Sequence, residues 1–226
     1  MKSRTLKRIC IVVVAVVFAL SLICAIALIM FQMRVDALHD DWRSALNQTE
    51  LSEPAQVDGV EAITQDISCG YAVIEMFSTW DGGNITEESL FNTYGKVVTS
   101  TGQAFCNEMN KQFPAYNTTM FKYLKDSELL TTVYRSLQAS VPVPIEWAAK
   151  CGDEWTLHYS LVIGMDAGND KVTVANPYGY VEELPFNEFL RRTSFEAYED
   201  MPFYLKLGFA FGVFELNTVF TPERAL

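Results

Sequence analysis

The pattern of hydrophobic positions changes twice along the chain and predicts three kinds of element. The first apolar run, Ile9–Phe31, is continuous and holds no charged residue. From Gly70 to Trp80 apolar residues recur at the spacing of one helix face, which predicts a buried helix. From Leu157 to Met165 they alternate with other residues, which predicts a strand. The expected order is a membrane-length helix, a mainly helical half and a β-rich half.

Local signals place the helices of the first half. The Gly70–Trp80 helix stops at Asp81-Gly82-Gly83, so Cys69 lies at its N-terminal end,. The segment Thr86–Tyr94 opens with a typical capping threonine followed by two acids, which predicts a second helix,. A third helix is predicted from Ser127 to Ala139,.

The second half predicts an antiparallel sheet. Leu157–Met165 and Lys171–Ala175 flank a polar turn and predict a β-hairpin,. Val141–Trp147 is predicted as an edge strand, because its two prolines cannot donate to a central ladder. Phe203–Phe214 is predicted as further strand, since Lys206 within it argues against a second membrane span,. The predicted fold class is α+β, with a helical half packed on an antiparallel sheet half.

The run Ile9–Phe31 is long enough to cross a bilayer as one helix,. Four basic residues precede it and only Arg34 closely follows it, which predicts a cytoplasmic N-terminus. The four are Lys2, Arg4, Lys7 and Arg8. We expect a cytoplasmic basic tail (1–8), a single-pass transmembrane anchor (9–31), a stalk (32–57) and an extracytoplasmic domain (58–226).

The N-terminus has two other interpretations. Val35-Asp36-Ala37 suits a signal peptidase, but the apolar run is long for a cleaved signal peptide and Arg34 intervenes,. A lipoprotein signal would need a small residue before Cys24, where the chain has the bulky Ile23. A retained anchor is the favoured interpretation.

Charge and missing motifs narrow the function. Outside the five basic residues that flank the anchor, 12 Lys and Arg stand against 28 Asp and Glu, a formal charge of −16. Such a surface repels nucleic acid, which is therefore not expected as a partner. The P-loop, H-E-x-x-H and C-x-x-C patterns do not occur,. We expect neither a metal nor another cofactor.

The thiols divide into two groups. Two of the five cysteines fall in the apolar run, and three lie outside it: Cys69, Cys106 and Cys151. An odd number outside suggests one working thiol and one pair, so a Cys106–Cys151 disulfide is predicted. The alternative is that both are small buried residues.

Four residues are candidates for catalysis. A thiol at a helix N-terminus beside an imidazolium ionises readily, which makes Cys69 the candidate nucleophile. His158 is its candidate base, because the other histidine, His39, lies in the expected stalk. Asn176 ends the strand paired with the one that His158 begins, so its amide can hold the imidazole. Gln65, four residues before Cys69, is the candidate oxyanion donor.

These residues lie in three segments with a known counterpart. Gln65-Asp66-Ile67-Ser68-Cys69-Gly70-Tyr71-Ala72, His158-Tyr159-Ser160-Leu161-Val162-Ile163-Gly164-Met165-Asp166 and Val172-Thr173-Val174-Ala175-Asn176-Pro177 together resemble the bacteriocin-processing type of papain-like cysteine peptidases. The resemblance spans roughly 64–192. It implies a bacterial source, a papain-like α+β fold, cleavage of a peptide substrate through a thioester, and no cofactor.

The resemblance gives Gln65, Cys69, His158 and Asn176 the four roles proposed above. Many relatives have Asp where this chain has Asn176, which alters the local charge. The family's namesakes act in the cytosol fused to an exporter, so their substrate class does not carry over. Another thiol acyl transfer, by a cell-wall amidase or a transpeptidase, stays open, as does a non-catalytic binding domain.

Overall fold

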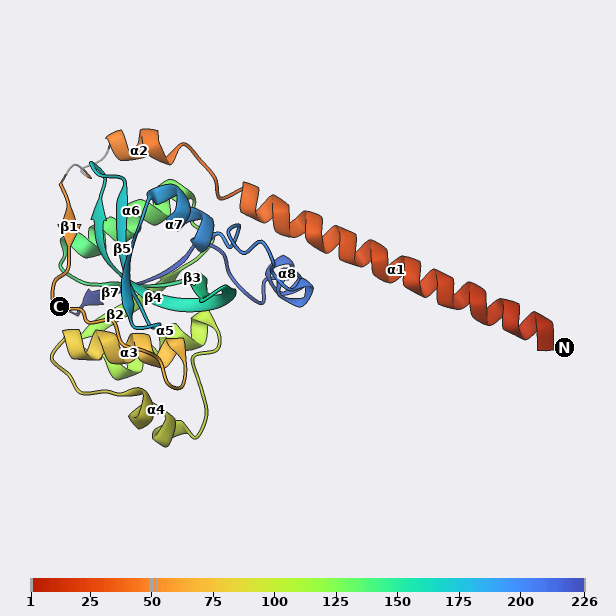
Figure 1. Ribbon diagram of the computed structural model, residues 1–226, viewed down its shortest axis with the longest axis horizontal. Helices are drawn as coiled ribbons and strands as arrows, with labels where there is room; N and C mark the ends of the chain where they lie inside the picture. Colours follow the sequence, from red (N-terminus) through yellow and green to blue (C-terminus); the bar gives the residue numbers. More distant parts are fainter. Residues whose placement is uncertain (1, 49–50, 52, 226) are drawn as a thin grey trace.

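A seven-stranded antiparallel sheet forms the centre of the domain, in the order β2-β7-β3-β4-β5-β6 with β1 paired to β4 (Figure 1). The strands are β1 (Ala55–Gln56), β2 (Tyr116–Phe121), β3 (Val143–Cys151), β4 (Glu154–Asp166), β5 (Lys171–Asn176), β6 (Tyr180–Leu184) and β7 (Thr218–Arg224). Antiparallel strands alternate their side chains between the two faces, so both faces of this sheet can carry a core.

The computed structural model describes residues 2–48, 51 and 53–225, without the side chains of 2–7, 45, 47 and 48. The helices are α1 (Lys2–Asp36), α2 (Trp42–Gln48), α3 (Cys69–Trp80), α4 (Glu87–Tyr94), α5 (Gly102–Gln112), α6 (Asp126–Gln138), α7 (Phe186–Thr193) and α8 (Phe203–Ala210). Figure 1 shows α1 projecting from the domain as a single long helix.

The two faces of the sheet pack against different helices. On one face, Phe77 of α3 and Phe105 of α5 join Tyr159 of β4 in a buried cluster. On the other, α6 and α7 contribute Leu129 and Phe189 to a cluster that contains Trp147 and Val162 of the sheet. The predicted packing of helices on an antiparallel sheet is confirmed, and the cysteine helix α3 lies directly against β4.

The strongest local signals gave the correct elements. Helices α3, α4 and α6 match the three predicted helices within one residue at their starts, and the β4–β5 hairpin is present. Helix α3 begins at Cys69, and Val73, Met76 and Phe77 are fully or almost fully buried. The apolar face read from the sequence is therefore the face that packs against the sheet.

Two element predictions were wrong. Strand β3 is an interior strand between β7 and β4, not an edge strand. It accommodates Pro144 because β7 pairs with β3 only at Ile145 and Glu146, so no β7 partner requires a donor from the proline,. The segment Phe203–Phe214 contains helix α8 instead of a strand. Its apolar residues lie on opposite sides of this helix, so their spacing shows no helical pattern in the sequence.

The segment 32–57, expected as a stalk, contacts the domain. Val35 and Leu38 are buried with residues of the domain, and His39 Nδ1 lies 2.8 Å from Asp126 Oδ2. Ala55 and Gln56 form β1, which pairs with β4. Except for positions 49, 50 and 52, which lie outside the described residues, this segment is attached to the domain along its length.

The predicted disulfide is absent. Cys106 is buried in α5 and its thiol contacts the Thr118 carbonyl oxygen at 3.4 Å. Cys151 is exposed at the end of β3, and both thiols are free. The alternative of a small buried residue therefore holds for Cys106 only.

Candidate active site

Cys69 occupies the first position of α3 because the preceding residue caps the helix. Ser68 has an extended backbone, and its hydroxyl accepts a hydrogen bond from the Tyr71 N–H at 3.2 Å,. Gly70 follows Cys69 because a β-carbon there would collide with the buried Thr99 side chain. The nucleophile candidate is thus held at a packed helix start.

The Glu87 carboxylate fixes the loop that leads into this helix. It accepts hydrogen bonds from three consecutive backbone N–H groups, those of Asp66 (2.9 Å), Ile67 (3.0 Å) and Ser68 (2.8 Å). Glu87 is 5% exposed, so these charge-assisted bonds are largely shielded from water. From the sequence, Glu87 is only an acid in the first turn of α4, and no motif indicates this role.

His158 and Asn176 lie together with a defined hydrogen-bonding pattern. His158 Nε2 is 3.0 Å from Asn176 Oδ1, and the Tyr178 N–H donates to the same oxygen at 3.0 Å. Asn176 Nδ2 donates to Glu182 Oε1 at 2.9 Å. These contacts fix which end of the amide is the carbonyl. A carbonyl only accepts, so His158 Nε2 carries the hydrogen and Nδ1 is the basic nitrogen.

A second set of contacts holds this pair. Glu182 Oε2 accepts from Arg192 Nη1 at 2.9 Å, so the carboxylate joins the Asn176 amide to α7. The Tyr178 ring stacks on the His158 imidazole, with centroids 4.2 Å apart. Tyr178 Oη lies 2.7 Å from Thr156 Oγ1. None of these supporting residues carried a distinctive sequence signal.

Gln65 lies beside the same strand end. Its backbone N–H donates to the Pro177 carbonyl at 2.7 Å, and Thr64 pairs with Tyr178 in an isolated bridge. Gln65 Oε1 is buried and has no hydrogen-bond partner among the described residues. This atom is an acceptor and suits a donor group of a bound substrate, whereas the oxyanion role needs the Nε2 group of the same amide.

The electrostatics differ from the expected ion pair. Burial raises the pKa of the Cys69 thiol, against the opposing effect of the Tyr159 and Gly70 backbone N–H groups. Burial lowers the pKa of His158 to about 4, opposed by its bond to Asn176. Both groups are therefore neutral near pH 7, and the expected imidazolium is not present. Among the described residues no hydrogen bond joins the two; Cys69 instead approaches the Tyr159 backbone, one residue along β4.

A buried acid lies on the nucleophile's side of the sheet. Glu146 of β3 is opposite Tyr159 of β4 in the ladder, and it is 1% exposed. Burial, and then the charge of Glu215, raises the pKa of Glu146 to about 8. Glu146 Oε2 and Tyr159 Oη are both buried without a partner within the described part of the chain. At neutral pH this carboxyl is mostly protonated and places little negative charge near the thiol.

A thiol at a helix start, packed against the strand that holds an amide-paired imidazole, is typical of a papain-like cysteine peptidase domain. The chain belongs to the Peptidase_C39 like family, whose sequence pattern matches residues 46–203. This confirms the resemblance read from the sequence. The described residues contain no group of three or more His, Cys, Asp and Glu side chains placed to hold a metal ion.

Two solved structures are similar to this chain. One is the peptidase domain of Streptococcus ComA, a bi-functional ABC transporter involved in a quorum sensing pathway, at 14% identity and a TM-score of 0.49, covering 74% of this chain and 100% of that chain. The other is a double glycine motif protease from an AMS/PCAT transporter in complex with the leader peptide, at 13% identity and a TM-score of 0.46, covering 76% and 99%. No curated protein matches the chain at a significant level.

Proposed function

We propose that this chain is a membrane-anchored cysteine peptidase in which Cys69 is the nucleophile, His158 the base and Asn176 the residue that orients the base. The observation that carries the proposal is the His158–Asn176 pair, whose amide is locked by Tyr178 and Glu182. This locking holds the hydrogen on Nε2 and keeps Nδ1 free to accept a proton. A neutral imidazole with a free Nδ1 is the form that a general base needs.

The neutral pair implies proton transfer at the moment of attack. His158 Nδ1 takes the Cys69 thiol proton as sulfur bonds to the carbonyl carbon of the peptide. The Cys69 N–H, which has no intrahelical acceptor at a helix start, and the Gln65 amide stabilise the oxyanion. The imidazolium then protonates the leaving amine, which departs and leaves a thioester. Water attacks the thioester with His158 again as the base, releasing the acid and restoring the thiol.

We further propose that α1 spans the membrane and that the domain lies outside the cell. One helix, Arg8–Asp36, is long and apolar enough to span a bilayer, and its apolar run is largely exposed. The excess of basic residues before this run favours a cytoplasmic N-terminus. Cleavage after Ala37 would remove Val35, which is 1% exposed in contact with the domain, and this favours a retained anchor. The proposed substrate is a peptide or protein on that side of the membrane.

Digestion of a peptide library by the full chain in lipid nanodiscs tests the peptidase proposal. Cys69→Ala should abolish cleavage, whereas Cys151→Ala, which removes another free thiol, should leave it unchanged. A peptide electrophile should label the parent at Cys69 and lose that adduct in Cys69→Ala. Cleavage that persists in Cys69→Ala would refute the assignment. Ligation of added amines without hydrolysis would instead establish a transpeptidase.

A further inference from the structure

Four large apolar side chains are exposed together on and just after α8. Phe203 is 42% exposed, Tyr204 69%, Phe211 62% and Val213 58%. Phe203, Leu207 and Phe211 recur at four-residue steps, so they lie along one side of the helical turn. We call Phe203, Tyr204, Leu207, Phe211 and Val213 the α8 patch.

The opposite side of α8 is apolar as well. Phe209 is fully buried and its ring packs against Phe31, Phe195 and Phe214, with centroids 4.6 to 5.7 Å apart. Lys206 is the one charged residue of α8, and a helix with apolar residues on opposite sides is typical of a protein interior or of a membrane. One side of α8 is covered by protein, and the α8 patch still needs a non-aqueous partner.

Helix α8 lies against the end of α1 that is closest to the domain (Figure 1). The residues from Ile9 to Ile23 are exposed, whereas Ala27, further along the same helix, is only 2% exposed. Ala27 therefore lies on the side of α1 that the domain covers. Arg34 Nη1 donates to the Phe209 carbonyl at 3.1 Å. If the hydrocarbon begins at Ile9, about 20 residues cross it and its outer edge falls near Leu28. The covered part of α1 therefore includes residues at the outer edge of the hydrocarbon.

The attachment of the domain to α1 keeps this arrangement in place. His39 pairs with Asp126 at 2.8 Å, and Asp40 accepts from the Ser127 backbone N–H at 3.0 Å. Asn217, the residue before β7, donates from Nδ2 to Asp126 Oδ1 at 3.0 Å, so one carboxylate holds the segment that follows α1 and the segment between α8 and β7. The domain therefore holds α8 at a fixed level along the anchor.

We propose that the α8 patch inserts into the outer headgroup region of the same bilayer that α1 spans, as a second membrane contact. The proposal rests on α1 being a membrane span. Its occupant is lipid because the patch continues the apolar surface of α1 at the level where the helix leaves the hydrocarbon. Aromatic residues are enriched at this level in membrane proteins. The contact is apolar, since the remainder of the chain is acidic and is repelled by anionic headgroups,.

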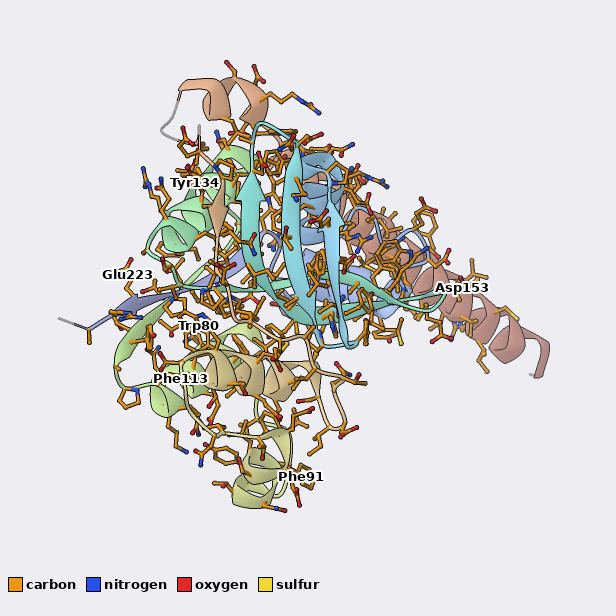
Figure 2. All side chains as sticks on the ribbon, turned by 60° about the vertical axis from the view of Figure 1, so that its left-hand side comes forward. Trp80, Phe91, Phe113, Tyr134, Asp153 and Glu223 are labelled. Atoms are coloured by element: carbon orange, nitrogen blue, oxygen red, sulfur yellow. The ribbon has the colours of Figure 1, made fainter. Side chains whose placement is uncertain are left out.

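Fluorescence quenching in liposomes tests the contact. The full chain is reconstituted in phosphatidylcholine, with or without bromine on the acyl chains, as Tyr204→Trp, Phe211→Trp and the control Phe91→Trp. Phe91 is an exposed aromatic residue on α4, 39% exposed against 69% for Tyr204 and 62% for Phe211, and Figures 1 and 2 show α4 away from α1. The four native tryptophans are common to all variants, so each added signal is read against the parent.

Bromolipid should quench the tryptophans added at 204 and 211 at least about threefold more than the one at 91, as expected for side chains in the headgroup and acyl boundary. Equal quenching at all three sites, with the protein still resistant to carbonate extraction, would overturn the α8 contact and leave the anchor standing. Extraction by carbonate would overturn the anchor itself. The added tryptophans could instead emit at shorter wavelength without quenching, with an effect that grows as more protein is added per liposome. That result would assign the patch to a second copy of the chain and overturn the lipid contact.

Discussion

Both the oxygen and the nitrogen of the Asn176 side-chain amide make hydrogen bonds, and this explains why Asn suits this position. Its oxygen accepts from His158 and Tyr178, while its nitrogen donates to the Glu182 carboxylate. An Asp would turn the last contact into two opposed carboxylates. The departure from relatives with Asp is therefore matched to a neighbouring acid that the sequence alone did not connect with it.

Asn176→Asp should lower kcat/KM by at least about tenfold and destabilise the domain by a few kcal/mol, because it buries like charges side by side. The double variant Asn176→Asp, Glu182→Gln restores a donor opposite the carboxylate. It should recover most of both losses and raise the pKa of His158 above its present value of about 4, moving the acid limb of the rate profile upward. Steady-state kinetics against pH and thermal unfolding measure both effects. Equal defects in the single and double variants would contradict this account.

Glu146 makes stability depend on pH. Its pKa is raised from 4.5 to about 8 in the folded chain, so the unfolded state loses the proton first as pH rises. Stability from this group is full below pH 4.5 and is lost as pH rises through 8. Glu146→Gln should therefore unfold about 5 °C or more above the parent at pH 8, with a smaller difference at pH 5.

Glu199→Gln, an exposed acid, is the control for the Glu146 experiment. The pKa of His158 is lowered to about 4, so its contribution runs the other way and is lost as pH falls from 6.5 through 4. The parent and Glu146→Gln share this effect, so the difference between their melting curves isolates Glu146. A difference that does not grow with pH would show that this carboxyl ionises normally.

At the scale of elements, the sequence located the parts whose causes are local. Helix α4 has its capping threonine and α3 its buried face, and both could be predicted within a residue. The segment of α8 was predicted as a strand because its apolar residues fall on opposite sides of the helix and show no helical period. Strand β3 was placed at the edge because two prolines suggested it, whereas its place depends on how far β7 extends along it. The place of β3 therefore depends on the pairing of distant segments, which no local signal shows.

The loop before α3 depends on an element that follows it in the chain. Glu87→Gln replaces one carboxylate oxygen by an NH₂ group, which faces backbone donors instead of accepting from them. We expect a loss of roughly 1–3 kcal/mol in the free energy of unfolding. We also expect kcat to fall by a larger factor than the change in KM, since the loop positions Gln65 and Cys69. Glu88→Gln, an exposed acid in the same turn, should behave like the parent. Parent-like unfolding and turnover in Glu87→Gln would remove this positioning role.

At the scale of the whole molecule, composition was enough to predict a long apolar helix at α1 but not its relation to the domain. The apolar run and its basic flank are properties of the sequence. The contacts of Val35, Leu38 and His39 with the domain are tertiary, whereas the polar residues around them suggested only a stalk. The structure instead attaches the domain directly to the end of α1. This attachment sets the distance of the candidate site from α1, and so from the membrane in the proposed arrangement.

The side of the membrane on which the domain lies can be read from Cys151, the exposed free thiol of the domain. A membrane-impermeant maleimide applied to intact cells should label the parent without prior reduction, because the thiol is accessible and unpaired. Cys151→Ala should lose most of this signal, since Cys106 is buried and Cys69 only partly exposed. Cys106→Ala is the matched control and should label like the parent.

Labelling that appears only after lysis would place the domain in the cytoplasm and reverse the orientation that the basic N-terminal residues predict. Labelling that requires a reductant in intact cells would restore the disulfide that the structure lacks, while still placing Cys151 outside. The two results are distinguishable because lysis without reductant exposes a cytoplasmic thiol but leaves a disulfide closed. An outward domain would also rule out direct cleavage of peptides in the cytosol, because the attachment of the domain to the outer end of α1 keeps the candidate site on the same side as Cys151.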